Sequence, residues 1–258
     1  MTTFCHSGST GDTFLSMVSV KILGGGDVYL KLRNIQKMIQ ERLGWPDAGR
    51  HRDRMTEDDF EEMREFMLHQ PHIHSFKPWN NEDIDYDLDN ACYTHETGFF
   101  PRNFSNQHAL ASKIDPQYHL RELQMDPWME CREERKFPGR PIVIHRSPNY
   151  QEGNSTVSPV WKGYIDRGLT EQAVFVGLES DHAYFEETYQ VSVPHYRTPD
   201  WMELARVIKG SELMITSMGG PSAVGLCLGK TMLVETRKNE SHERLEHNYP
   251  FRINIDYF

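Results

Sequence analysis

Short apolar runs alternate with amphipathic stretches along the C-terminal half of the chain. Continuous apolar runs at 141–144 and 173–177 are typical of strands buried in a parallel sheet. The pattern further predicts a helix over 179–189, a strand over 191–193, a helix over 201–208, a strand over 213–216, a helix over 222–228 and a strand over 231–235. This alternation indicates right-handed βαβ units in a doubly wound parallel sheet, whose ligand crevice lies beyond the carboxyl ends of the strands.

The N-terminal half shows the same alternation less regularly. It predicts a strand over 3–6, a helix over 13–23, a strand over 28–32, a helix through 60–67, and short strands over 73–76 and 84–88. Thr56 and Asp59 form an approximate capping box for the helix through 60–67, and Pro71 stops it. Prolines within 99–135 favour a connecting region. We therefore expect an N-terminal domain over 1–135 and a C-terminal domain over 136–258.

Composition and charge narrow the function classes. The 258 residues are 38% hydrophobic and 26% charged, which is ordinary for a globular protein. Neither an apolar run of membrane-spanning length nor a secretory leader is visible, so we expect a cytoplasmic protein. The four cysteines contain no C-x-x-C pair, which favours reduced thiols. A net charge of −10 disfavours broad attraction to nucleic acid or anionic lipid.

A glycine-rich turn with an aspartate joins the first predicted strand to the first helix. Gly8 and Gly11 allow backbone amides to approach a ligand at a helix N-terminus, where the helix dipole favours anions. The carboxylate of Asp12 can accept a proton from a reacting group. The alternative is that Asp12 only caps the helix that begins near Thr13.

A second turn joins the strand over 213–216 to the next helix. Two glycines, a proline suited to the first helical turn and a hydroxyl form a plausible phosphate cradle, although the spacing is not that of a P-loop. Its candidate residues are Ser217, Met218, Gly219, Gly220, Pro221 and Ser222. A tight turn with a purely structural role is an equal alternative.

A cationic side chain follows the buried strand at 141–144. Arg146 can bind a diphosphate through two parallel hydrogen bonds, or it can be an ordinary ion-pair partner. No one of the three turns decides the function alone. Their presence on one chain favours an anionic ligand held at strand ends.

The sequence patterns that could indicate a metal site or a Ser-His-Asp triad are weaker. Asp85, Asp87 and Asp89 alternate along a predicted strand without a glycine turn to enclose an ion. His72 and His74 have no third zinc ligand at useful spacing, so these histidines and His69 fit a solvated turn better. No G-x-S-x-G elbow occurs either. We expect no metal site.

Three segments of the chain resemble one enzyme family. HSGSTGDTFLSMVSVKILGGGDVYL, which begins at His6, resembles the N-terminal glycine and aspartate loop of the heptosyltransferase-like glycosyltransferases of family nine, which have the GT-B architecture. YRTPDWMELARVIKGSELMITSMGGPSAVGLCLGKTMLVET, which begins at Tyr196, resembles their donor-binding segment. PIVIHRSPNY also fits, particularly the compact versions found in bacteriophages.

The resemblance implies an α/β fold of two Rossmann-like domains with parallel sheets that face each other across a cleft, the N-terminal one trimmed. It implies a nucleotide-sugar donor in the C-terminal domain and an acceptor in the N-terminal domain. Asp12 falls on the catalytic base. The residues that fall on donor contacts are Gly11, Arg146, Glu179, Ser217, Met218, Gly219, Gly220, Pro221 and Ser222, with Glu179 toward the nucleoside. GT-B enzymes neutralise the leaving diphosphate without a divalent ion, so the resemblance implies neither a metal nor a cofactor.

Two positions depart from the family pattern. Ser217-Met218-Gly219 stands where Asp-Thr/Ser-Gly is usual, and Val224 lies where a histidine is common. The leading prediction is a metal-independent inverting glycosyltransferase. A nucleotide-sugar epimerase or hydrolase of the same architecture and a binding module without catalysis are the alternatives.

Two acceptor classes are compatible with the sequence. One is a glycan, and the other is a hydroxylated base of phage DNA modified in the host cytoplasm. The DNA alternative predicts a basic groove lined by Lys31, Arg33, Arg50, Arg52 and Arg54. Scatter of these residues over the surface would favour a glycan or a small molecule.

Overall fold

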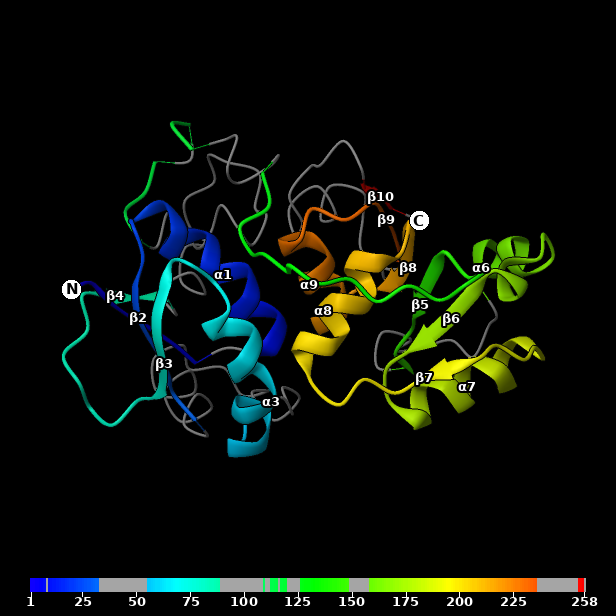
Figure 1. The fold of residues 1–258 in the computed structure, drawn as a ribbon, viewed down its shortest axis with the longest axis horizontal. Coiled ribbons are helices and arrows are strands. Elements are labelled where there is room, and N and C mark those ends of the chain that lie inside the picture. The colour runs from blue at the N-terminus through cyan, green and yellow to red at the C-terminus, as the bar shows by residue number, and fades with distance from the viewer. Residues whose placement is uncertain are drawn as a thin grey trace, which may run out of the picture. The chain divides into compact units, whose positions relative to one another are not determined.

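Two compact units, each an α/β sandwich, make up the computed structural model (Figure 1). The structure describes residues 1–7, 9–32, 55–88, 109, 112–115, 117–119, 126–148, 158–235 and 255–257. The described residues of the first unit lie within 1–130, and those of the second begin at Cys131. Residues 131–135 pack with the second unit, because the Arg135 amide donates to the Arg206 carbonyl at 2.9 Å.

The described part of the first unit contains a parallel sheet in the order β3-β2-β1-β4. The strands are β1 (Thr3–His6), β2 (Gly26–Leu30), β3 (Ile73–Pro78) and β4 (Tyr86–Asp87), and the helices are α1 (Thr10–Ile22) and α3 (Glu57–Leu68). Phe14 of α1 packs edge-on against Phe66 of α3, with ring centroids 5.5 Å apart. Both side chains are fully buried. The apolar faces of the two helices therefore meet in the core of this unit.

The described part of the second unit contains a parallel sheet in the order β10-β9-β8-β5-β6-β7. Its strands are β5 (Ile142–His145), β6 (Ala173–Val176), β7 (His195–Tyr196), β8 (Leu213–Ser217), β9 (Met232–Glu235) and β10 (Ile255–Tyr257). Read from β7, this is the order 3-2-1-4-5-6 of a Rossmann sheet. The strand order therefore reverses between β5 and β8, and that point is where such sheets bind ligands.

Helices cover both faces of the second sheet. They are α6 (Pro159–Ile165), the 3-10 helix η4 (Leu169–Glu171), α7 (Glu179–Tyr189), α8 (Trp201–Gly210) and α9 (Gly220–Cys227). Trp161 of α6 and Phe185 of α7 pack with Phe175 and Ile215 on one face. On the other face, Gly225 of α9 lies against the sulfur of Met232, where a larger residue would not fit. The predicted doubly wound α/β arrangement is confirmed for this unit.

Most element boundaries agree with the sequence prediction to within two residues, and two elements differ more. Helix α1 begins at Thr10, three residues before the predicted start, because Ser9 caps it. The strand predicted over 191–193 is wrong, since the sheet pairs at His195 and Tyr196. Gln190 ends α7 in a left-handed conformation, and the Val193 amide donates to the side chain of Glu186 at 2.8 Å. Helix α6 and strand β10 had no sequence prediction.

In the described part of the chain, each sheet has a strand of two residues at one edge, β4 in the first unit and β7 in the second. Cys5, Cys131 and Cys227 are buried free thiols, while Cys92 lies outside the described residues. Among the helices that the structure describes, none combines the length and the apolar character that a bilayer crossing requires.

Candidate active site

Asp12 lies in the first turn of α1, which follows β1 at the carboxyl end of the first sheet. It is the third helical residue and forms a capping box with Ser9. The Ser9 hydroxyl donates to Asp12 Oδ2 at 2.9 Å, and the Asp12 amide donates back to the Ser9 hydroxyl at 3.4 Å. Gly11 is the preceding helical residue, and Gly8 lies outside the described residues. The sequence alternative had Asp12 cap a helix that begins near Thr13, whereas Ser9 is the cap and Asp12 completes the capping box from within the helix. This contact fixes the carboxylate near the strand end.

His6, the last residue of β1, contacts the first turn of α1 through Thr13. It had no functional assignment from the sequence. Its Nδ1 lies 3.3 Å from the Thr13 hydroxyl, which donates to the Ser9 carbonyl at 3.0 Å. Burial lowers the pKa of His6 to about 3, so the ring is neutral at physiological pH. A polar residue at the end of an otherwise apolar strand is the sequence signal that could have identified it.

Three further side chains lie at the carboxyl ends of the same sheet. Lys31 follows β2, Asp87 ends β4, and Trp79 follows β3. Lys31 Nζ lies 3.1 Å from Asp87 Oδ2 and 5.4 Å from the centroid of the Trp79 ring. Of the groove predicted for DNA, only Lys31 is placed, because Arg33, Arg50, Arg52 and Arg54 lie outside the described residues.

Arg146 lies at the end of β5, where the strand order of the second sheet reverses. Its Nε and Nη2 donate to the two carboxylate oxygens of Glu235 at 2.7 and 2.9 Å. The side chain is 2% exposed and stacks over Tyr189 at 5.1 Å from the ring centroid. The pair of N–H groups expected to bind a diphosphate therefore already binds a protein carboxylate, in a buried ion pair and not on the surface.

The ends of β5 and β8 are tied together at the switch point. The Ser147 amide donates to the Ser217 hydroxyl at 3.0 Å. His145 Nδ1 lies 3.2 Å from the Thr216 hydroxyl, and burial lowers the pKa of His145 to about 4. Both hydroxyls are fully buried. These bonds fix the ends of β5 and β8. The predicted donor-binding residues 217–222, called the donor turn below, follow β8 directly.

The donor turn itself is compact. The Gly219 amide donates to the Ser222 hydroxyl at 2.9 Å, and that hydroxyl donates to the Gly219 carbonyl at 2.8 Å. Gly219 has φ +151°, a backbone conformation that residues with a side chain rarely adopt. A methyl group on Gly220 would lie 2.5 Å from the ring of Trp201, so the turn and α8 pack without space between them. Pro221 stands in the first turn of α9, and Met218 is 7% exposed.

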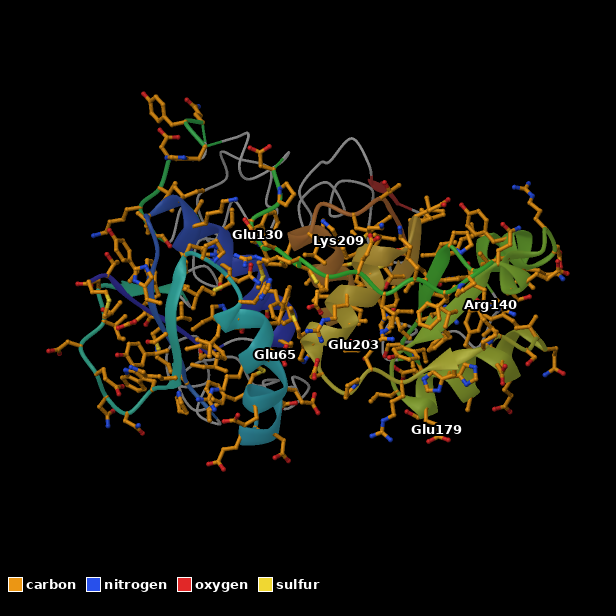
Figure 2. The ribbon with its side chains drawn as sticks, in the orientation of Figure 1. Glu65, Glu130, Arg140, Glu179, Glu203 and Lys209 are labelled. Atoms are coloured by element: carbon orange, nitrogen blue, oxygen red, sulfur yellow. The ribbon has the colours of Figure 1, made fainter. Side chains whose placement is uncertain are left out.

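Glu179 is the exposed first residue of α7, directly after the end of β6 (Figure 2). Asp181, two residues on, is buried, and burial raises the pKa of its carboxyl. The sequence prediction selected Glu179 and not Asp181. Both belong to the carboxyl edge of the second sheet.

The weaker metal candidates have protein partners. Asp85 accepts from the amide and the hydroxyl of Thr3 at 2.9 and 3.0 Å, and these bonds lower the pKa of its carboxyl. Asp87 pairs with Lys31, and Asp89 lies outside the described residues. Within the described ranges, no three His, Cys, Asp or Glu side chains are grouped so that they could hold a metal ion.

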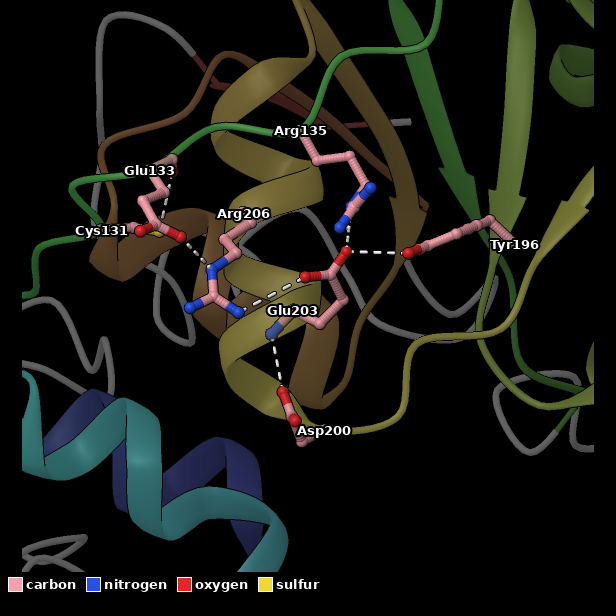
Figure 3. A network of polar contacts seen from close by, with 7 residues as sticks. All are labelled: Cys131, Glu133, Arg135, Tyr196, Asp200, Glu203 and Arg206. Atoms are coloured by element: carbon pink, nitrogen blue, oxygen red, sulfur yellow. Dashed lines mark hydrogen bonds and ion pairs between the residues drawn. The ribbon is translucent and has the colours of Figure 1, made fainter.

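A polar network joins the start of the second unit to α8 (Figure 3). Glu203 of α8 is buried and accepts from Arg135 and from the Tyr196 hydroxyl, the latter at 2.8 Å. Arg206 lies 3.5 Å from Glu203 and 2.9 Å from Glu133. The network therefore fixes α8, whose first residue Trp201 contacts the donor turn.

No protein-family model matches the chain, and no curated protein matches its sequence. Solved structures do match the fold. The ADP-heptose LPS heptosyltransferase II of E. coli superposes with a TM-score of 0.59 at 12% identity, covering 100% of this chain and 90% of that one. The chain has the fold of these glycosyltransferases. An E. coli heptosyltransferase with ADP-2-deoxy-2-fluoro heptose gives 0.54 at 8% identity, over 100% and 93% of the two chains.

A glycosyltransferase of family 9 from Veillonella parvula matches with a TM-score of 0.52 at 10% identity, over 91% of this chain and 80% of that one. Identities this low establish the glycosyltransferase fold and not the activity. The predicted resemblance therefore holds at the level of the fold, and the chain spans most of the length of these neighbours.

Proposed function

We propose that the chain is an inverting glycosyltransferase that moves a sugar from a nucleotide-diphosphate donor to an acceptor hydroxyl. The observation that carries the proposal is the placement of two sites in a glycosyltransferase fold. Asp12 stands at the carboxyl end of one parallel sheet, and the Gly219 turn stands at the switch point of the other. The solved neighbours include enzymes of ADP-heptose, so an ADP-sugar is the donor to test first.

Asp12 acts as the general base in this proposal. Its carboxylate takes the proton of the acceptor hydroxyl, whose oxygen forms a bond to the anomeric carbon as the bond to the diphosphate breaks. A single displacement of this kind inverts the configuration at that carbon. The hydroxyl of Ser9 holds Asp12 Oδ2 at 2.9 Å, so the base is oriented before the substrate arrives.

The second unit binds the donor in this proposal. The start of α9 at Gly220 and the N-terminal amides of its first turn favour a diphosphate through the helix dipole. Gly11 extends the same chemistry from α1 in the first unit. Arg146 keeps the strand end beside the donor turn in place through its ion pair with Glu235. Glu179 contacts the nucleoside. Neutralisation by these groups makes the reaction independent of a metal, and the first unit holds the acceptor.

The decisive test uses two aspartates that share one structural role. Asp59 is the third residue of α3 and forms the same capping box with Thr56 that Asp12 forms with Ser9. Asp12→Asn and Asp59→Asn therefore remove matching capping charges. We expect Asp12→Asn to lower the transfer rate by about 10²- to 10⁴-fold, the usual contribution of a general base, and Asp59→Asn to leave it within about twofold.

Transfer is measured with ADP-heptose in the presence of EDTA, and donor binding is measured by calorimetry. Donor affinity should be equal in both variants. Full activity of Asp12→Asn would reject the assigned base, and loss of activity on adding EDTA would reject metal independence. Release of ADP without transfer to any acceptor would favour the epimerase or hydrolase alternative, and absence of binding across a panel of nucleotide diphosphates would reject the enzyme.

A further inference from the structure

Lys31, Trp79 and Asp87 form a cluster beside the Asp12 turn that the proposed reaction leaves without a role. They follow or end three different strands of the first sheet, and all three lie at its carboxyl edge. We call them the edge cluster. Ligands of parallel α/β sheets bind at this edge, so the cluster stands where a substrate of the first unit would lie.

The ion pair of the edge cluster crosses the end of β1. The sheet order is β3-β2-β1-β4, so Lys31 on β2 must reach past β1 to meet Asp87 on β4. The distance from Lys31 Nζ to Asp87 Oδ2 is 3.1 Å. Both charges act on the pKa of His6 at the end of β1, which places the pair close to that ring. His6 contacts Thr13, the neighbour of Asp12, so the cluster adjoins the proposed catalytic base.

Trp79 is held in one orientation next to the ion pair. Its amide donates to the Leu30 carbonyl at 3.0 Å, and its ring nitrogen donates to the Glu82 carbonyl at 3.0 Å. The ammonium of Lys31 lies 5.4 Å from the ring centroid. The ring is only partly buried, so an ordered aromatic surface remains exposed beside the carboxylate.

The two charges of the pair are not equally exposed. The Lys31 side chain is 13% exposed, whereas that of Asp87 is 40% exposed. A ligand that approaches the cluster therefore meets a carboxylate and an indole, with the ammonium covered behind them. A polyanion such as DNA would be repelled by the carboxylate, because its neutralising lysine lies deeper. A neutral sugar gains hydrogen bonds from its hydroxyls to the carboxylate, and its C–H face packs on the ring.

We propose that Trp79 and Asp87, with Lys31 behind them, bind a neutral polyhydroxylated sugar as the acceptor. The inference rests on the proposed transferase function and chooses the glycan over the modified DNA base. Asp87 orients acceptor hydroxyls, Trp79 stacks on the ring of the sugar, and Lys31 fixes the carboxylate toward the ligand.

The test uses the full chain, ADP-heptose as donor and two acceptor probes. The probes are a panel of neutral methyl glycosides and a DNA duplex containing 5-hydroxymethylcytosine. We expect Asp87→Asn and Trp79→Ala each to raise the acceptor KM at least about tenfold, the scale of one hydrogen bond to a charged group, with the donor KM unchanged. Asp85→Asn is the matched control, since its carboxylate on the same segment binds Thr3, and it should leave both constants unchanged.

Direct binding of the glycosides, followed by tryptophan fluorescence, gives a readout that does not require turnover. Binding to the wild type that is lost in Trp79→Ala and Asp87→Asn supports the subsite. Transfer with an unchanged acceptor KM in both variants, a preference for the DNA probe, or no binding of any glycoside to the wild type overturns it. Glycoside binding without sugar transfer would reject the proposed function and leave the subsite standing.

Discussion

Asp12 and Asp59 show what a single residue can and cannot reveal. Both are the third residue of a helix, and both accept from a capping Ser or Thr and return a backbone bond. The sequence predicted the capping box at Thr56 and Asp59 and also allowed a cap at Asp12. Local pattern is identical in the two cases, because capping depends on four consecutive residues. Only the position of α1 at the carboxyl end of β1 distinguishes Asp12, and that position requires the fold.

The buried His6 makes a prediction about acid stability. Its pKa is about 3 in the folded protein against an ordinary value of 6.5, so the unfolded chain binds a proton first as pH falls. Its contribution is therefore fully present above pH 6.5 and is lost between about pH 6.5 and 3, with a slope approaching ~1.4 kcal/mol per pH unit. His145 of the second unit acts with the same sign, from 6.5 down to about 4.

We expect His6→Asn to weaken this loss. The variant is less stable than the wild type at pH 7, because it disturbs the contact with Thr13, but its free energy of unfolding falls less steeply between pH 6.5 and 4. Urea unfolding at a series of pH values measures this. His74→Gln, at an exposed position of β3, is the control and should run parallel to the wild type. Parallel curves for His6→Asn and the wild type would mean that His6 is not the group responsible.

At the scale of elements, the sequence predicted the alternation of strands and helices because apolar residues recur with a different period in each kind of element. Helix α7 has the bounds that its pattern predicted, and β8 differs by one residue. β7 could not be placed, since a two-residue edge strand is defined by its partner Val176 and not by its own apolar content. The Arg135 and Glu203 pair was equally hidden, because 68 residues separate its partners along the chain.

The network around Glu203 predicts a specific loss of stability. Glu203→Gln leaves Arg135, Arg206 and the Tyr196 hydroxyl facing a neutral side chain in a buried position. We expect the second unit to lose about 1 to 3 kcal/mol, the cost of disrupting buried hydrogen bonds to a charged group. Thermal unfolding followed by circular dichroism measures the change.

The matched control for Glu203 is an exposed pair on a helix. Glu61 lies 3.3 Å from Arg64, with side chains 60% and 53% exposed. Glu61→Gln should change stability by less than about 0.5 kcal/mol, as exposed pairs do. Equal effects of the two substitutions would show that the network does not fix α8.

At the scale of the whole molecule, composition and pattern predicted two α/β units, and the structure contains them. The resemblance added the glycosyltransferase fold, which the superpositions bear out. The sequence did not reveal that the Arg146 fork binds Glu235, because no local rule joins residues 89 positions apart. The sequence therefore identified candidate residues at the strand ends, but it did not identify the side chains that form hydrogen bonds and ion pairs with them.

Ligand binding should raise the thermal stability of the full chain by mass action. ADP at about 100 times its dissociation constant is expected to stabilise the binding unit by ~2.7 kcal/mol, seen as an upward shift of its melting temperature. Gly220→Ala, which drives a methyl group against Trp201, should reduce the shift by displacing the donor turn. Gly163→Ala, where the added carbon meets no atom within 4 Å beyond its chain neighbours and its own helix backbone, should retain it. Equal shifts in the two variants, or none in the wild type, would contradict donor binding at this turn.

The two-residue strands at the sheet edges also bear on self-association. An exposed strand edge presents unpaired N–H and C=O groups on which a second molecule can build an intermolecular sheet. β4 and β7 offer only Tyr86–Asp87 and His195–Tyr196 as such a template. At the opposite edge of the first sheet, β3 ends in Pro78, which has no N–H to donate. Within the part of the chain that the structure describes, β4 and β7 therefore give a second molecule few backbone groups on which to extend either sheet.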